Sequence, residues 1–301
     1  MLKKLQSHFP TSILLNLPPQ SSFDQYFWIK DTQNEPVWLG IPKTDIHEEQ
    51  LELLSSLFEV VDSKPAFQLT EVEKQWQEFL FHEGAPPINT EGEIRIIHYH
   101  ISTTKTDSTE WDKALKEFFI DSPFIQIDEK SGIIILEKTA LDYGEEDFSA
   151  ISSTLENDFF IRLEFYIGKK RTAPQEIREA FFLERELFIE GLKLISKERV
   201  FTYEKIFPAI TAARLPDIPK KLLETDVIEL LRKDGELLES MKVFLENNSN
   251  TSLAAKKLYI HRNTLQYRLE KFQDLTGINV KTFSSAITIY LACILAQKNN
   301  G

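Results

Sequence analysis

The chain has 301 residues and a formal net charge of −12, and its 42% hydrophobic and 27% charged residues are typical of globular domains, which argues against a disordered or fibrous protein. Its 10 glycines and 13 prolines argue against a glycine-rich phosphate-binding enzyme and against a turn-rich all-β protein. The chain has one cysteine, Cys293, so it cannot form an intramolecular disulfide, which fits a reducing compartment. We also expect neither a signal peptide nor a membrane span, so the expected location is the cytoplasm.

The first predicted part, residues 1–88, is a small α/β unit and the expected sensor domain. Its strands and helices are expected at Gln25–Lys30, Pro36–Ile41, His47–Val61 and Glu71–Phe81. The first helix places Leu51, Leu54 and Phe58 on one face, which is the spacing of an amphipathic helix. A chain breaker, Gly84-Ala85-Pro86-Pro87, closes this part.

The second predicted part, residues 92–207, has its strands and helices in the order β-α-β-β-α-β. They are expected at Ile94–Ile101, Thr109–Phe119, Phe124–Ile127, Ile133–Glu137, Phe148–Phe159 and Arg162–Gly168. The first strand is apolar on both of its alternating faces, so we expect it at the centre of a sheet that is covered on both sides. A long helix, Pro174–Ile195, follows with proline at its start.

Three groups of residues in this part have two interpretations each. His98 and His100 share one face of their strand, where they either pack or bind a metal, although spacing places no third ligand. Asp128 and Glu129 are either turn residues or the metal-binding carboxylates of a nucleotide cyclase, although the chain has no Gly-Gly pair for close approach to a nucleotide. The run Lys169–Arg171 is either a solvated loop or a second DNA site. We favour the first interpretation in each case.

The third predicted part, residues 222–301, is all helical, and Pro208, Pro216 and Pro219 mark the passage to it. Its helices are expected at Thr225–Arg232, Glu236–Asn247, Ser252–Tyr259, Arg262–Leu275 and Phe283–Gln297. The last of these helices, with Ile287, Tyr290, Leu291, Ile294 and Leu295, is a candidate for a dimer contact, and so is the long helix of the second part. Packing within the domain would account for both helices equally well.

The segment 253–269 has the pattern of a helix-turn-helix. Ala255 is small enough for two helices to cross closely, and the apolar residues that hold the pair together are Leu253, Leu258, Ile260, Leu265 and Leu269. We expect Thr251 to cap the first helix and the chain to turn over residues 259–261, with Tyr259 at a position where such motifs often have glycine. The second helix begins with a polar face, which a recognition helix needs in order to reach base edges in the major groove.

The side chains of this polar face suit DNA. Arg262 can pair with guanine, and Asn263 or Gln266 with adenine, each through two hydrogen bonds. Other side chains are expected to bind phosphate, which fixes the register without reading the sequence; these are Thr264, Arg268, Lys256 and Lys257. The complete set of predicted DNA-binding residues is Thr251, Lys256, Lys257, His261, Arg262, Asn263, Thr264, Gln266, Tyr267 and Arg268.

The distribution of charge favours DNA binding by this part alone. From Ser240 onward there are eight basic and three acidic residues, whereas the preceding chain has 27 basic and 44 acidic residues. A basic segment on an acidic body is expected where a single module contacts phosphate. The alternative is an ordinary helical hairpin whose polar face is only solvated.

Residues 237–297 closely resemble the C-terminal domain of the PucR/CdaR family of bacterial regulators. The resemblance is carried by Phe244-Leu245-Glu246-Asn247-Asn248, by His261-Arg262-Asn263-Thr264-Leu265 with Tyr267-Arg268-Leu269, and by Leu275-Thr276-Gly277-Ile278. It implies a helix-turn-helix similar to that of Fis-type proteins, in a dimer-forming regulator that responds to small molecules through a variable N-terminal domain. The middle part also resembles the GGDEF-like domain that this family often carries, in its strand order and in Ile167-Gly168 before the long helix.

The predicted fold is therefore multidomain α+β, with an α/β N-terminal domain, a GGDEF-like middle domain and an all-α helix-turn-helix domain at the C-terminus. The predicted function is sequence-specific binding of double-stranded DNA by a transcriptional regulator, a homodimeric activator with a small-molecule effector. We expect no enzyme activity, cofactor, metal or membrane partner. The alternative is a degenerate GGDEF-like nucleotide-binding signalling protein, or a protein-interaction module, that does not bind DNA.

Overall fold

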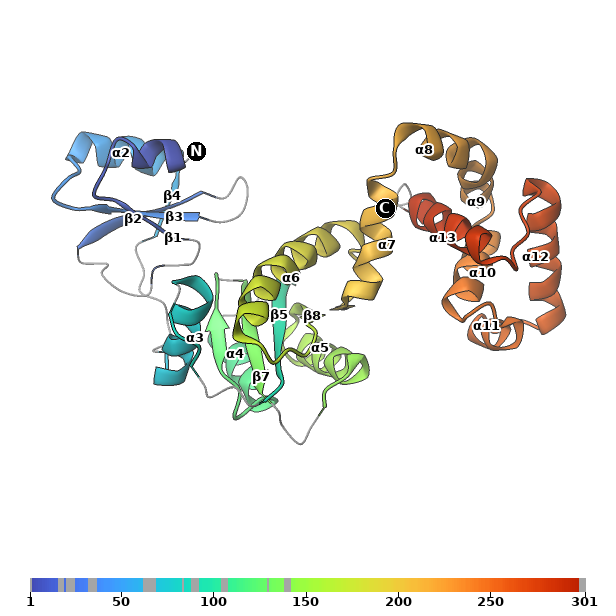
Figure 1. The fold of residues 1–301 in the computed structure, drawn as a ribbon, viewed down its shortest axis with the longest axis horizontal. Helices are drawn as coiled ribbons and strands as arrows, with labels where there is room; N and C mark the ends of the chain where they lie inside the picture. Colours follow the sequence, from blue (N-terminus) through green and yellow to red (C-terminus); the bar gives the residue numbers. More distant parts are fainter. Residues whose placement is uncertain are drawn as a thin grey trace. The chain divides into compact units, whose positions relative to one another are not determined.

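The computed structural model describes residues 2–15, 19, 25–31, 37–61, 69–82, 84–87, 92–103, 108–128, 130–137 and 142–297. The chain divides into two compact units, Met1–Arg185 (the N-terminal unit) and Glu186–Gly301 (the C-terminal unit), and the boundary falls inside the long helix α6 (Figure 1). None of the helices within the described ranges is long and apolar enough to cross a membrane. The expected mixed α/β architecture with a helical C-terminal region is confirmed.

The first sheet of the N-terminal unit is antiparallel, in the order β1-β3-β2-β4. Its strands are β1 (Ile13–Leu15), β2 (Tyr26–Asp31), β3 (Val37–Pro42) and β4 (Glu59–Val60), and the helices of this region are α1 (Leu2–Gln6) and α2 (Glu48–Leu57). The predicted helix His47–Val61 is therefore too long. The backbone is extended at Phe58, and Val60 pairs with Ile29 of β2. Pairing along β2 satisfies these peptide groups, and it outweighs the helical spacing of the apolar residues.

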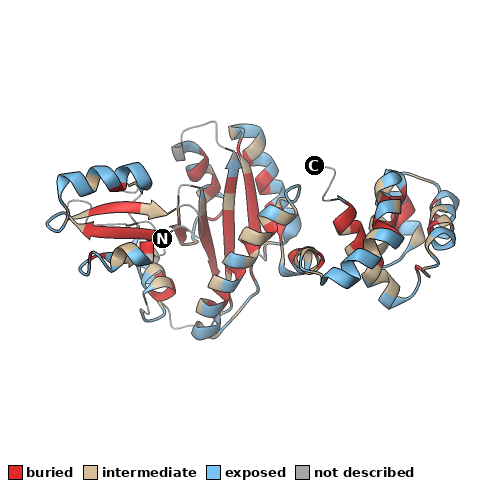
Figure 2. Cartoon of the chain, turned by 90° about the horizontal axis from the view of Figure 1, so that it is seen from above, coloured by how far each residue is buried: buried red, intermediate tan, exposed pale blue. Residues whose placement is uncertain are grey.

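The second sheet has β5 (Ile94–Thr103) at its centre, between β7 (Ser131–Glu137) and β8 (Arg162–Ile167), and both pairings are antiparallel. β6 (Phe124–Gln126) pairs with β7, so the order within this unit is β6-β7-β5-β8. Helices α4 (Ser108–Glu117), α5 (Glu145–Phe159) and α6 (Pro174–Leu194) complete the predicted order of elements. The central place predicted for the first strand is confirmed, and Figure 2 shows the strands of this sheet largely buried.

Helix α3 (Glu71–Phe81) has its predicted bounds and packs on the second sheet. A capping box begins it, because Thr70 Oγ1 accepts the Glu73 N–H and the Glu73 carboxylate accepts the Thr70 N–H. Trp76 and Leu80 are fully buried in one core with Ile96 of β5. The sequence assigned α3 to the first part of the chain, but its apolar face completes the core of the second part.

Packing and a contact with a carboxylate account for the two histidines of β5. His98 is 2% exposed and stacks on Phe181; burial, together with the charge of Arg185, lowers the pKa of His98 to about 3, so its ring stays neutral. His100 lies 3.4 Å from the Glu164 carboxylate. Among the residues that the structure describes, no three His, Cys, Asp or Glu side chains are grouped so that they could hold a metal ion.

The other two ambiguous groups also have structural roles. Asp128 accepts hydrogen bonds from the Lys130 N–H at 2.8 Å and the Ser131 hydroxyl at 2.7 Å, so it is a turn residue as predicted, whereas Glu129 lies outside the described residues. In the loop 169–171, Lys170 forms an ion pair with Asp142, and Arg171 forms one with Glu184. These ion pairs favour a structural loop over a second DNA site.

The C-terminal unit is a bundle of helices. After α6 its elements are β9 (Val200–Phe201), α7 (Tyr203–Ala213), α8 (Asp217–Leu223), the π-helical turn η1 (Glu224–Ile228), α9 (Glu229–Lys233), α10 (Gly235–Glu246), α11 (Thr251–Lys257), α12 (Arg262–Thr276) and α13 (Phe283–Gln297). Helix α10 is central, because it contacts α9, α11, α12 and α13 (Figure 1). Each of the last four helices lies within two residues of its predicted bounds.

Two helices were not predicted in this unit. Pro208 and Pro216 were expected to mark a passage between domains, but Pro208 lies inside α7 and Pro216 immediately precedes α8. Helix α7 buries Ile206, Ala209 and Ala212 and packs against α13. This burial outweighs the loss of the one backbone N–H that Pro208 lacks.

Helix α13 packs within its own unit. It buries Ile289, Cys293 and Ala296 among the helices around it, and burial raises the pKa of the Cys293 thiol to about 12, in agreement with the prediction of a core residue. Of the side chains predicted as dimer contacts, Leu291, Ile294 and Leu295 join the same core, and Ile287 is exposed. Packing within the unit therefore accounts for most of this helix.

Candidate nucleic-acid interface

Helix α11 begins at Thr251 and is capped by the residue before it. The side-chain oxygen of Asn250 accepts hydrogen bonds from the N–H groups of Ser252 and Leu253, both at 3.1 Å. The prediction that Thr251 is the N-cap is therefore wrong by one residue. Asn250 has the extended backbone of a cap, whereas Thr251 is already helical and half-buried.

Helix α11 packs against α12 through small side chains. Ala254 and Ala255 of α11 are 0% and 3% exposed, and they share a core with Leu265 and Leu269 of α12. This agrees with the expectation that a small residue allows the two helices to approach closely. The position of α12 relative to α11 therefore depends on the volume of the side chains at these two alanines.

A Schellman motif ends α11. The Ile260 N–H donates to the Ala255 carbonyl at 3.0 Å, and the Tyr259 N–H donates to the Lys256 carbonyl at 3.2 Å. Tyr259 has a φ of 55°, the left-handed conformation in which such a motif usually has glycine. The prediction that Tyr259 occupies a glycine-type position of the turn is confirmed.

The start of α12 is open to solvent. His261 caps this helix, because its Nδ1 accepts the Asn263 N–H at 3.2 Å. His261, Arg262, Asn263 and Thr264 are all exposed, and Tyr267 is 66% exposed. The side of the helix that was predicted to contact DNA is therefore accessible. Because the Nδ1 of His261 caps the helix, its Nε2 is the ring nitrogen that can bind a base or a phosphate.

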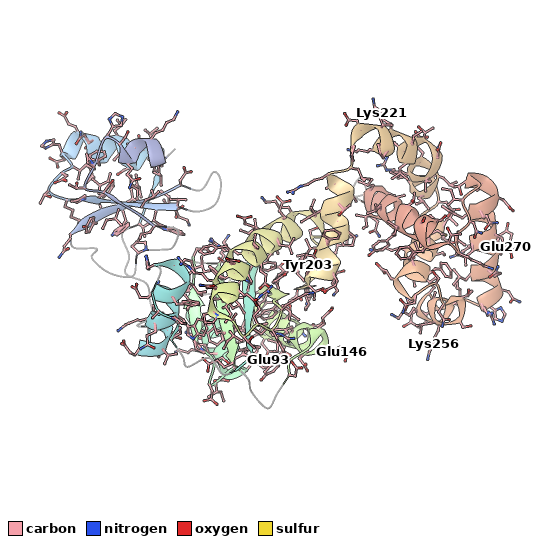
Figure 3. All side chains as sticks on the ribbon, in the orientation of Figure 1. Glu93, Glu146, Tyr203, Lys221, Lys256 and Glu270 are labelled. Carbon is pink, nitrogen blue, oxygen red and sulfur yellow. The ribbon has the colours of Figure 1, made fainter. Side chains whose placement is uncertain are left out.

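The exposed face of α12 changes its chemistry along the helix. At helical spacing it presents first Asn263 and Tyr267 and then Glu270 and Asp274. Glu270 points outward from α12 in Figure 3, and its carboxylate accepts a hydrogen bond from the Gln266 amide at 2.9 Å. Because carboxylates repel phosphate, only the first two turns of α12 suit DNA. Gln266 has to exchange its bond with Glu270 in order to reach a base.

Three of the predicted cationic residues are available for phosphate or base contacts. Lys256, Lys257 and Arg262 are exposed, and none of them forms an ion pair with the part of the chain that the structure describes. Lys256 projects outward from α11 in Figure 3. The three side chains lie at the end of α11 and at the start of α12, on either side of the turn.

Arg268 faces α10 instead of solvent. Its guanidinium forms an ion pair with Glu236 and donates to the Ser240 hydroxyl at 3.0 Å, and 20% of the side chain is exposed. One turn further, Lys271 donates to Asp234 at 2.8 Å, and this hydrogen bond lowers the pKa of Asp234 and raises that of Lys271. Asp234 is also the N-cap of α10. Two ion pairs therefore hold α12 against the start of α10.

We expect Arg268 to position α12, in place of the phosphate contact predicted from the sequence. Arg268→Gln and Glu236→Gln should then each weaken specific DNA binding by about three- to tenfold, because both break the same ion pair. Neither should change the slope of log affinity against log salt. Lys257→Gln is the control that removes a phosphate contact, so it should make this slope less negative by about 0.9. Fluorescence anisotropy over a series of salt concentrations measures both quantities.

The variant at Glu236 separates the two roles of Arg268. If Arg268 bound phosphate and Glu236 only competed for it, removal of the negative charge of Glu236 would raise the affinity for DNA. A rise in affinity with Glu236→Gln, or a changed salt slope with Arg268→Gln, would therefore contradict the positioning role.

Sequence reasoning missed two features of this site. The cap Asn250 has a local signal, because asparagine before a helix is a preferred N-cap, but the neighbouring Thr251 carries the same signal. Glu236 and Ser240 have none, because they are 32 and 28 residues away from Arg268 in the chain. Only the packing of α12 on α10 brings them together.

Comparisons with known proteins match this region of the chain to one known domain. Residues 237–295 match the PucR C-terminal helix-turn-helix domain, and this range includes the whole of α11 and α12. Over 259 residues the chain is 29% identical to the uncharacterized protein YxkF of Bacillus subtilis. The matched stretch covers 85% of this chain and 87% of that protein.

Two relatives named as regulators are similar over shorter stretches. The proline-responsive transcriptional activator PutR of Bacillus subtilis is 38% identical over 63 residues, which are 21% of this chain and 15% of that protein. The purine catabolism regulatory protein of Bacillus subtilis is 41% identical over 64 residues, which are 21% of this chain and 12% of that protein. The chain therefore matches only a small part of the length of these two relatives.

Proposed function

We propose that this DNA-binding transcriptional regulator binds its operator as a homodimer, activates transcription and responds to a small-molecule effector. The observation that carries the DNA-binding role is the exposed start of α12, which lies beside cations that have no ion pair among the described residues. In this proposal Arg262, Asn263 and Gln266 contact base edges. The residues that contact phosphate or the groove wall are Thr251, Lys256, Lys257, His261, Thr264 and Tyr267.

Two copies of the chain are expected on the operator. Only the first two turns of α12 suit DNA, so one recognition helix contacts too few base pairs for useful specificity. A homodimer doubles the contacts and reads two half-sites that are related by symmetry.

The effector is expected to bind outside the helix-turn-helix. PutR is named for proline and the other regulator for purine catabolism, yet each shares little more than 60 residues with this chain. Proteins named for different compounds thus share only a short segment with this chain. This supports an effector site outside that segment, in residues 1–207. The name of PutR supports an activating role. We infer a sensor domain in residues 1–88 except α3, which packs with the GGDEF-like domain inferred in residues 92–207, and a DNA-binding domain in residues 222–301.

Two observations support a GGDEF-like middle domain without catalysis. Its elements follow one another as β5-α4-β6-β7-α5-β8, the order on which the resemblance rests. The Asp128 carboxylate in the hairpin is engaged by Lys130 and Ser131 of the same turn. These hydrogen bonds give the Asp128 carboxylate a role within the turn that needs no metal ion.

Selection from sheared genomic DNA of the source organism tests the proposed function. Purified full-length protein should retain fragments that share two inverted half-sites, about 10–10.5 base pairs apart or a multiple of this distance. Retention should fall steeply as salt rises. Light scattering should give the mass of two chains for the free protein, and the mass of two chains plus one DNA fragment for its complex. Fragments with no common motif would contradict specific DNA binding, and a monomer on a single half-site would contradict the dimer.

A further inference from the structure

The side chain of Tyr259, at the tip of the turn between α11 and α12, extends into solvent. It is 97% exposed, more than any other large apolar or aromatic side chain in the described part. Within the same part of the chain, its hydroxyl forms no hydrogen bond and its ring contacts no other aromatic ring. The folded structure therefore does not account for an aromatic residue here.

Tyr259 is also unfavourable for the backbone of the turn. Its φ of 55° places it in the left-handed region, where a side chain crowds the backbone and glycine does not. The hydrogen bonds of the Schellman motif use only its backbone N–H and that of Ile260. Glycine would form the same turn with less strain, which makes Tyr259 a candidate for an interaction outside the folded chain.

The surroundings of Tyr259 identify the chemistry of that interaction. Lys256 and Lys257 precede it at the end of α11, and His261 and Arg262 follow it at the start of α12. All four side chains are exposed. A phenol hydroxyl in such a cationic environment suits an anionic oxygen acceptor, and tyrosine is among the side chains that bind DNA phosphate.

We propose that Tyr259 is a phosphate-contacting residue: its hydroxyl donates a hydrogen bond to the DNA backbone at the edge of the groove that α12 enters. The proposal rests on the proposed DNA-binding function and adds a residue outside the predicted set. The contact makes the turn itself part of the interface, between the phosphate-binding end of α11 and the base-reading start of α12. It offsets the backbone strain only when DNA is bound.

Two substitutions in the full-length protein test this role, because they separate the fold from binding. Tyr259→Gly should raise the Tm of the C-terminal unit by about 3–5 °C, since it relieves the left-handed strain. It should also weaken operator binding by about tenfold, the effect of losing one hydrogen bond to a charged group. Tyr259→Phe keeps the ring and the strain, so it should lose the same affinity without a change in Tm. The loss should be equal at all salt concentrations, because tyrosine carries no charge.

The N-terminal unit offers a matched control. Phe160 also has a φ of 55° and is 72% exposed, at the end of α5. Phe160→Gly should therefore stabilise its own unit and leave operator affinity unchanged. If Tyr259→Gly or Tyr259→Phe binds the operator as tightly as the wild type, the phosphate contact is refuted. Failure of the wild type itself to bind any operator would instead refute the proposed function.

Discussion

Arg262→Ala is expected to weaken operator binding by about 1–3 kcal/mol, roughly 5- to 150-fold, and to relax the preference for one base pair. Arg262 is the first residue of α12, is exposed and forms no ion pair within the described ranges. Its guanidinium is thus free to pair with guanine, and its loss should leave the fold intact. Titration of the wild type and the variant with a set of single-base operator variants measures the affinity and the base preference. Circular dichroism checks the fold.

Lys233→Ala is the matched control for this experiment. Lys233 also lies in the C-terminal unit, on α9, and its side chain is 77% exposed. The variant loses the same charge at a position outside the helix-turn-helix, so its operator affinity should stay within about twofold of the wild type. An Arg262→Ala protein that is unfolded, or that keeps its affinity and base preference, would refute the assignment.

Ala255→Leu is expected to destabilise the C-terminal unit by about 1–3 kcal/mol. Ala255 is 3% exposed where α11 packs against α12, and its carbonyl accepts the Ile260 N–H that closes the turn. A leucine at this position has to push the two helices apart, which also moves the start of α12. We therefore expect weaker operator binding together with a lower free energy of unfolding. Denaturant unfolding followed by far-ultraviolet circular dichroism measures the change in stability.

The N-terminal unit is an internal reference for the unfolding of the Ala255→Leu variant. All four tryptophans, Trp28, Trp38, Trp76 and Trp111, lie in the N-terminal unit, so tryptophan fluorescence reports on that unit alone. The fluorescence transition should stay in place while the transition in circular dichroism shifts. Ser252→Leu, at an exposed position of the same helix, should change stability by less than about 0.5 kcal/mol. Equal stability of Ala255→Leu and the wild type would show that the crossing has room for a larger side chain.

Local sequence patterns predicted much of the fold and the exposed part of the site. Helices α3 and α13 were predicted with their observed bounds, and β5 was predicted at the centre of its sheet. Such elements carry their signals in neighbouring residues, as apolar spacing and as preferred end residues. The exposure of residues 261–264 follows in the same way, because Leu265 and Leu269 direct the opposite side of α12 into the core.

The sequence by itself determined where the helix-turn-helix lies, which side of its second helix is exposed, and that the surrounding residues are basic. These three features depend only on the helical period and on charges nearby in the chain. Only the tertiary structure decided that residues 59–60 form a strand, that Pro208 lies within a helix, and that Arg268 binds Glu236. Each of these outcomes depends on a segment distant in the chain. Burial and ion pairing between such segments outweigh local propensity, and a linear pattern contains no record of them.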